Sequence, residues 1–103
     1  MKHVTIADKS LLIGDAVADV LVRYATLLGK MNSADNVIIR SIGIDGEEVE
    51  ANYLLNSGTV MMTESTRSTL PEPDNADAQS YMEDRLQHYE DYSFPDPDTF
   101  GAN

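Results

Sequence analysis

The stretch of sequence that decides the fold is "NVIIRSIGIDGEEVEANYLLNSGTVMMT", residues 36–63. β-Branched residues flank the dipeptide Asp45-Gly46, which supplies the positive φ angles of a two-residue type I′ hairpin turn. A loop of that length fixes the register of the two strands, and it places Arg40 opposite Ala51. We therefore predict an antiparallel hairpin centred on this turn.

A third strand is expected to follow the hairpin. Ser57-Gly58 suits a second tight turn, which places Tyr53 opposite Met62 and makes a three-stranded antiparallel meander. One face of this sheet then collects most of the apolar side chains: Ile38, Ile42, Val49, Ala51, Tyr53, Leu55, Val60 and Met62. We expect a helix to cover this face, because an antiparallel sheet commonly packs one side on the core.

The opposite face of the predicted sheet is mixed. Most of its positions are polar, but an apolar cluster lies at one end and consists of Val37, Ile39, Leu54 and Met61. Contiguous apolar patches on a surface mark contacts with other molecules. We therefore predict that these four residues bind a partner.

Arg40 lies on the apolar face in the predicted register, and this position requires an explanation. Burying an unpaired guanidinium is costly. Arg40 is therefore expected to extend its charged end to an edge of the sheet, to pair with a carboxylate, or to bind a ligand. In the last case Tyr53 would line the wall of the ligand pocket.

The chain before this region predicts a hairpin and a helix. Residues 4–13 alternate apolar and polar side chains around Asp8-Lys9, which indicates a small hairpin, with a helix starting at Ser10 as the alternative. From Asp15 onward, apolar residues follow the three- and four-residue spacing of one helical stripe: Val17, Val20, Leu21, Tyr24, Leu27 and Leu28. Gly29 suits the position just past the helix end.

A second helix is predicted near the C-terminus. Pro71 and Pro73 disfavour helix in the residues before them, and Asp74 suits an N-cap. The apolar stripe of this helix consists of Ala78, Tyr81, Met82, Leu86 and Tyr89. The simplest packing places it on the second face of the sheet or against another subunit.

Together these patterns predict an α+β protein. We expect an antiparallel β-meander of three to five strands, with one long amphipathic helix on one face and a C-terminal helix. Residues 1–90 should form a single α+β domain, because a chain of 103 residues suits one core. Residues 91–103 should form an acidic, aromatic C-terminal tail that is flexible.

The charge of the chain limits its partners. The formal net charge is −11, and residues 71–103 hold nine of the 18 acidic residues but one of the seven basic ones. Such a field repels nucleic-acid phosphates and anionic lipids. The chain also has no apolar run of about 20 residues and no signal-peptide pattern at its start. We therefore expect a cytoplasmic location, with no nucleic-acid and no membrane partner.

Few patterns in the chain indicate chemistry. The absence of cysteine excludes disulfides, thiolate catalysis and cysteine-ligated metals. The histidines, His3 and His88, are accompanied by no nucleophile elbow, zinc-protease helix, EF-hand loop or glycine-rich phosphate loop. We therefore predict no catalytic residue, no metal site and no cofactor.

The C-terminal tail carries spaced aromatic residues among acids. Tyr92, Phe94 and Phe100 are interleaved with Asp96 and Asp98. This composition is typical of short segments that bind a basic, grooved partner, so the three aromatic residues are predicted to bind a partner. A solvated terminus and a strap across a dimer partner are the alternatives.

The leading functional hypothesis is a small, non-catalytic, cytoplasmic interaction or regulatory protein. It would be a homodimer that docks a protein partner through its apolar sheet and helix surface and its acidic tail, and a basic protein is one candidate partner. One alternative is a small-molecule-binding or enzymatic domain with an anion-binding pocket near Arg40. The other is an acidic mimic of nucleic acid that binds a basic protein.

Overall fold

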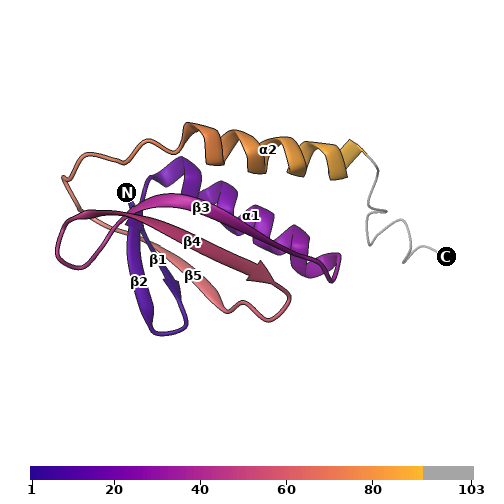
Figure 1. Ribbon diagram of the computed structural model, residues 1–103, viewed down its shortest axis with the longest axis horizontal. Coiled ribbons are helices and arrows are strands. Elements are labelled where there is room, and N and C mark those ends of the chain that lie inside the picture. The colour runs from indigo at the N-terminus through magenta and orange to yellow at the C-terminus, as the bar shows by residue number, and fades with distance from the viewer. Residues whose placement is uncertain (92–103) are drawn as a thin grey trace.

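A computed structural model describes residues 1–91 of the chain, with side chains through Tyr89. Five strands and two helices follow one another in the order ββαβββα (Figure 1). They are β1 (Lys2–Ile6), β2 (Lys9–Ile13), α1 (Asp15–Lys30), β3 (Ala34–Ile42), β4 (Glu48–Asn56), β5 (Met61–Ser65) and α2 (Ala76–Asp91). The predicted α+β class, with an antiparallel sheet and two helices, is confirmed.

The sheet consists of two parts that are joined at one point. Its strand order is β4-β3-β2-β1-β5, and every pairing is antiparallel. Strands β3 and β4 pair along their whole length, and β1 pairs with both β2 and β5. Between the two parts, β2 and β3 share a single bridge, Leu12 to Ile42. The β1–β2 hairpin therefore diverges from the β3–β4 hairpin, as Figure 1 shows.

The predicted pairing of β5 with β4 is wrong. Strand β5 pairs with β1 instead, with Met61 opposite Ile6, and β4 is left at the edge of the sheet. Residues 57–60 form a loop rather than a two-residue turn, because Thr59 bonds back to the end of β4. Pairing with β1 places Met61 beside Ile6 among the partly buried residues that pack on the core.

The β3–β4 hairpin is confirmed, but its predicted register is wrong by one residue. The loop contains three residues, 44–46, because the Gly43 N–H donates to the Glu47 carbonyl at 2.9 Å and the Gly46 N–H donates to the Gly43 carbonyl at 3.0 Å. Gly46 has φ 83°. A three-residue loop that ends in a left-handed glycine is the next most common hairpin connection after the two-residue loop.

This extra loop residue reverses the two faces of β3. Arg40 lies opposite Glu50 rather than Ala51. A shift of one residue moves every side chain of a strand to the other face. The core side of the hairpin therefore holds Val37, Ile39, Ser41, Ala51, Tyr53 and Leu55, so the prediction was correct for β4 and wrong for β3.

Helix α1 covers the core side of the sheet with the predicted apolar stripe. Its buried residues are Val17, Ala18, Val20, Leu21, Tyr24, Leu27 and Leu28. The helix continues through Gly29 to Lys30, and the left-handed position after it falls on Asn32, with φ 52°. The predicted stop at Gly29 is therefore wrong by a few residues, which is an ordinary uncertainty for helix ends.

Helix α2 packs against α1 and not on the second face of the sheet (Figure 1). Met82 and Leu86 are buried in the same core as α1, and the rings of Tyr24 and Tyr81 meet edge to face at 6.3 Å. The expected position of this helix is thus corrected. The apolar stripe of α2 is narrow. The apolar side of α1 that the sheet does not cover matches this stripe better than the mixed outer face of β3 and β4 does.

The side chain of Asn75, just before α2, bonds to the backbone of β3 where a neighbouring strand would otherwise do so. Because β2 diverges, the backbone of Arg40 has no strand partner on that side. The Asn75 side chain accepts a hydrogen bond from the Arg40 N–H at 2.7 Å and donates one to the Arg40 carbonyl at 2.8 Å. The predicted N-cap at Asp74 is wrong by one residue, because α2 starts at Ala76 and the Asn75 carbonyl accepts its first helical bond, from the Gln79 N–H at 2.9 Å. The Asp74 carboxylate nevertheless accepts the Ala76 N–H at 3.0 Å.

Replacing Asn75 with alanine is expected to destabilise the protein, because each lost hydrogen bond contributes about 0.5–1.5 kcal/mol. Urea unfolding of the full chain measures the loss. Ser80→Ala, on the exposed side of α2, is the control and should change stability little. Equal midpoints for the two variants would show that Asn75 does not hold the start of α2 on β3.

Candidate functional site

A groove of about 940 Å³ lies between the β1–β2 hairpin and β4. On one side it is lined by residues 43–45 and 49–54, and on the other by Val4, Ile6 and residues 8–11. The groove exists because β2 and β3 share one bridge and diverge beyond it. We call it the β4 groove.

The β4 groove lies beside the edge of β4 rather than over one face of the sheet. Its lining includes six consecutive residues of this strand, residues 49–54. Successive side chains of a strand point to opposite faces. A space that touches all six must therefore wrap the strand's edge. In the part of the chain that the structure describes, β4 pairs with β3 and with no strand on this other side.

The side chains in the groove are mainly apolar. Val4 and Tyr53 are buried, whereas Ile6, Leu11 and Ala51 are partly buried. Val49 also lines the groove and is 40% exposed. A ligand that covers the exposed part of Val49 would displace water from apolar surface, which favours binding.

The hydroxyl of Tyr53 is already satisfied inside the protein. It shares a hydrogen bond of 2.8 Å with the Ser41 hydroxyl, and Ser41 is fully buried. Burial raises the pKa of Tyr53, and the bond to Ser41 lowers it by less. Tyr53 therefore stays neutral and contributes an apolar ring to the groove.

The backbone of β4 offers free hydrogen-bonding groups along the groove. In an antiparallel ladder, alternate residues direct their N–H and C=O groups toward the partner strand. The Gly43–Glu47 bond assigns the odd-numbered residues of β4 to β3. Glu48, Glu50 and Asn52 therefore direct their backbone groups away from β3, toward the open edge.

Thr59 marks the end of this open edge. Its hydroxyl accepts the Asn56 N–H at 3.0 Å and donates to the Leu54 carbonyl at 3.3 Å. Both groups belong to the even-numbered set of β4, which supports the assignment above. The free part of the edge thus extends from Glu48 to Asn52.

The rim of the β4 groove is acidic. Three of its lining residues are acidic, Asp8, Asp45 and Glu50, and one is basic, Lys9. The Glu50 carboxylate also lies 3.7 Å from a nitrogen of Arg40, which offsets part of its charge. The net charge of −11 on the whole chain has the same sign. Cationic groups are therefore attracted to this rim, and the attraction weakens as salt concentration rises.

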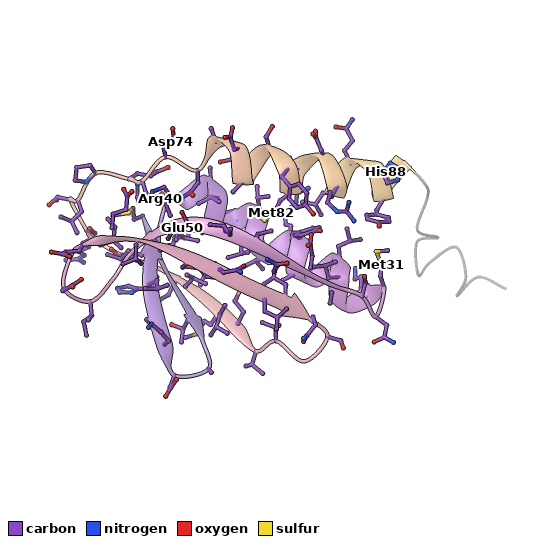
Figure 2. All side chains as sticks on the ribbon, viewed as in Figure 1. Met31, Arg40, Glu50, Asp74, Met82 and His88 are labelled. Carbon is purple, nitrogen blue, oxygen red and sulfur yellow. The ribbon has the colours of Figure 1, made fainter. Side chains whose placement is uncertain are left out.

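Arg40 lies outside the groove, on the outer face of β3 (Figure 2). Its side chain is 47% exposed; Nε donates to the Glu48 carboxylate, and a second nitrogen lies 3.7 Å from the Glu50 carboxylate. The hydrogen bond to Glu48 raises the pKa of Arg40 further above its ordinary range. Of the three roles considered for Arg40, the structure shows pairing with carboxylates.

Arg40 and Tyr53 do not form a common pocket. Because of the register, Arg40 lies on the outer face of the hairpin, whereas Tyr53 lies on the core side. An anion approaching Arg40 would meet Glu48 and Glu50 first. The arrangement therefore gives no support to an anion site built from Arg40 and Tyr53.

The residues predicted to bind a partner do not form one surface. Val37 and Ile39 are buried in the core, whereas Leu54 is 63% exposed and lines the end of the β4 groove. Met61 packs against the core from β5. The reversed faces of β3 and the new partner of β5 separate these four residues. The other three predicted residues, Tyr92, Phe94 and Phe100, lie outside the described residues.

A second polar cluster joins α1, β3 and α2. Asp35 accepts hydrogen bonds from the hydroxyls of Tyr24 and Tyr81, the latter at 2.6 Å. Arg85 donates to the Tyr24 hydroxyl at 2.9 Å, and its guanidinium lies 5.7 Å from the ring centres of Tyr81 and Tyr89. We call this set the tyrosine–aspartate cluster.

The environment of the tyrosine–aspartate cluster favours fixed protonation states. Burial raises the pKa of Tyr24, as do its hydrogen bonds to Asp35 and Tyr81. Burial also raises the pKa of Asp35, but the bonds donated by Tyr24, Tyr81 and the Asn36 N–H, together with the charge of Arg85, outweigh it, so the net shift is downward. A neutral Tyr24 and an ionised Asp35 are thus favoured near neutral pH, which suits a clamp between elements.

The histidines are not part of either site. His3 lies on β1 opposite Glu64 of β5, and the His88 ring meets the Tyr89 ring at 5.4 Å near the end of α2 (Figure 2). Residues 1–91 contain no group of three or more His, Cys, Asp or Glu side chains arranged to hold a metal ion. Neither described helix combines the length and hydropathy that a membrane span requires.

Comparison of the chain with protein-family models, curated proteins and solved structures finds no match. Function must therefore be inferred from the two sites themselves. The sequence did not reveal the β4 groove, because it depends on which strands pair. The tyrosine–aspartate cluster has one local signal in the sequence, the spacing of Tyr81 and Arg85, which lie four residues apart on α2.

Proposed function

We propose that this protein is a small, non-catalytic interaction module that binds a segment of another protein in the β4 groove. The observation that carries the proposal is that an unpaired edge of a nine-residue strand forms one wall of an apolar groove. Exposed strand edges are rare in natural proteins unless they are protected or used for pairing.

The charged residues support a binding role over a chemical one. The side chains of the tyrosine–aspartate cluster are engaged with one another across three elements. The β4 groove, in contrast, has an apolar lining and carboxylates on its rim. Binding through apolar contacts with a charged rim is the common pattern of protein interfaces.

Replacing Val49 with lysine is expected to weaken peptide binding by about tenfold or more, because a desolvated cation would occupy the apolar lining. Peptides selected from a random display library against the full chain are the probe, and their affinities are measured by titration. Val49 is 40% exposed, so the variant should fold. Selected peptides that bind this variant and the wild-type chain equally would contradict the proposal.

Ile38→Lys is the matched control for this experiment. Ile38 is a β-branched strand residue that is 51% exposed on the outer face, outside the lining of the β4 groove. The substitution changes the net charge by the same amount as Val49→Lys. Peptide affinity should therefore remain near that of the wild-type chain.

A small apolar molecule is the second candidate ligand for the same groove. The volume of the β4 groove, about 940 Å³, lies within the range of small-molecule sites. In that case thermal-shift screening would find compounds whose effect is lost in Val49→Lys, and the peptide library would yield no binder. This candidate does not use Arg40, whose charge is paired with Glu48.

Four further parts of the sequence-based hypotheses stay predictions. Homodimerisation is tested by light scattering of the full chain across concentrations. Docking through the acidic tail is tested by comparing the full chain with a chain that ends at Asp91. Cytoplasmic location rests on the lack of a long apolar run and of a signal-peptide pattern in the sequence. Mimicry of nucleic acid rests on the charge of the chain, and it requires binding to a basic protein that weakens with salt.

A further inference from the structure

We propose that the occupant of the β4 groove is an extended segment that pairs with β4 as an added antiparallel strand, with alternating apolar residues and basic residues at both ends. This inference rests on the proposed function, and it specifies the conformation and the chemistry of the partner. Three features support strand addition: the free edge of β4, the apolar lining of the β4 groove and the charge of its rim.

The free edge sets the backbone pairing. The backbone groups of Glu48, Glu50 and Asn52 are directed away from β3, and Thr59 occupies the next carbonyl, that of Leu54. Neighbouring strands lie about 4.7–4.9 Å apart, so an added strand would run directly beside β4 in the groove. Main-chain hydrogen bonds would provide affinity that does not depend on the partner's side chains.

The lining of the groove sets the side-chain pattern. Directly opposed residues of an antiparallel pair share one face of the sheet. Partner residues opposite Glu48, Glu50 and Asn52 would therefore lie on the outer face, in solvent. The residues between them would lie on the same face as Val49 and Ala51, inside the apolar groove. An alternation of apolar and polar residues is thus required.

The rim sets the charge of the partner. Asp8 and Asp45 line opposite sides of the groove, in the turn of the β1–β2 hairpin and in the β3–β4 loop. Glu50 lies on β4 and directs its carboxylate to the outer face, 3.7 Å from Arg40, so the charge of the rim comes mainly from the two aspartates. One base, Lys9, accompanies them. Lysine or arginine residues next to the apolar stretch of the partner would meet these carboxylates and increase its rate of association.

The same charge argues against two other occupants. A second copy of this chain also carries a net charge of −11, and its own β4 edge would bring Glu48 and Glu50 to the groove. Residues 92–103 of the chain contain Asp96 and Asp98 and no basic residue. Both would meet a rim of the same sign, whereas a basic segment of another protein would not.

Synthetic peptides test the inference on the full, isotope-labelled chain. The reference peptide alternates valine and threonine and has lysines at both ends. Its binding should shift the amide resonances of Glu48, Glu50 and Asn52 most. Glutamates in place of the terminal lysines should weaken binding by about tenfold at low salt, and added salt should reduce this difference.

Backbone methylation of the reference peptide provides the sharpest control. The threonines would lie opposite the even-numbered residues of β4 and direct their N–H groups at this strand. N-methylation of the threonines should therefore abolish binding, whereas N-methylation of the valines should preserve it. Equal effects of the two methylation patterns, or equal binding of the lysine and glutamate peptides, would overturn the inference.

The outcomes separate this inference from the proposed function. Library peptides that depend on Val49 but do not follow the methylation and charge pattern would leave the proposed function intact and overturn strand addition. If no library peptide depended on Val49 for binding, both the proposed function and the inference would be overturned. A free chain that dimerises, with the β4 edge amides protected from hydrogen exchange, would identify a second copy as the occupant and overturn the inference.

Discussion

Replacing Met82 with alanine is expected to lower the free energy of unfolding by about 2–5 kcal/mol, the usual cost of removing a large buried side chain. Met82 is 0% exposed and joins α2 to the core, and Figure 2 shows it directed from α2 toward α1. Small domains have total stabilities of about 5–15 kcal/mol, so this loss should be large relative to the whole. Urea unfolding of the full chain measures it.

Glu83→Ala, at the next residue of α2, is the control for Met82→Ala. Glu83 is exposed, so its replacement should change the free energy of unfolding by less than about 0.5 kcal/mol. A Met82→Ala variant as stable as the control would mean that α2 is not packed on α1. In that case the outer face of the sheet would again be a candidate position for this helix.

Local periodicity was sufficient to predict the helices. The three- and four-residue spacing of Leu21, Tyr24 and Leu28 identified the buried side of α1, and the stripe containing Met82 and Leu86 identified that of α2. Such patterns depend on residues close in sequence. The element that each helix would cover was not encoded locally, and α2 was placed on the wrong surface.

The register of the β3–β4 hairpin could not be decided from its loop. Asp45-Gly46 fits a two-residue turn, and the same glycine fits the left-handed end of a three-residue loop, as observed. The apolar pattern did not decide between them, because Ile38 and Ile39 are adjacent and both faces of β3 have β-branched residues. The error placed Arg40 on the core side and led to a ligand pocket that the structure does not support.

The β4 groove was beyond sequence-based prediction because it depends on two distant pairings. Strand β5 had to pair with β1 rather than β4, and β2 had to leave β3 after one bridge. Neither follows from a residue pattern within one segment. The acidic residues of the rim, in contrast, have the same sign as the net charge of the chain, which is read directly from the sequence. The constraint that this charge places on partners stays a prediction.

The tyrosine–aspartate cluster combines residues separated by up to 61 positions, from Tyr24 on α1 to Arg85 on α2. Tyr24 and Tyr81 were assigned to apolar stripes. Tyr24 is buried as expected, whereas Tyr81 is 42% exposed and its ring contacts Tyr24 rather than the sheet. Their hydroxyl groups, however, both donate to Asp35 at the start of β3. This shared contact depends on the packing of α2 on α1, which the sequence did not reveal. A buried tyrosine hydroxyl needs a hydrogen-bonding partner, but this requirement does not identify which residue supplies it, and the cluster was not predicted from the sequence.

Replacing Asp35 with asparagine is expected to lower stability near neutral pH by about 1.5–3 kcal/mol, the contribution of hydrogen bonds to a charged group. The folded-state pKa of Asp35 lies below its ordinary value of 3.8, because the bonds from Tyr24, Tyr81 and the Asn36 N–H and the charge of Arg85 together outweigh the effect of burial. A lowered pKa gives stability that is fully present above the ordinary value and is lost as pH falls through the folded-state value. The stability curves of the wild-type chain and the variant should therefore converge in acid.

Asp84→Asn provides the control for this pH dependence, since it removes one carboxylate from an exposed position of α2. Its stability curve should follow that of the wild-type chain at every pH. Urea unfolding between neutral pH and strong acid measures all three proteins. If the difference between Asp35→Asn and the wild-type chain were constant throughout, the contribution of Asp35 would come from its shape and neutral hydrogen bonds, and the charge would not hold α1, β3 and α2 together.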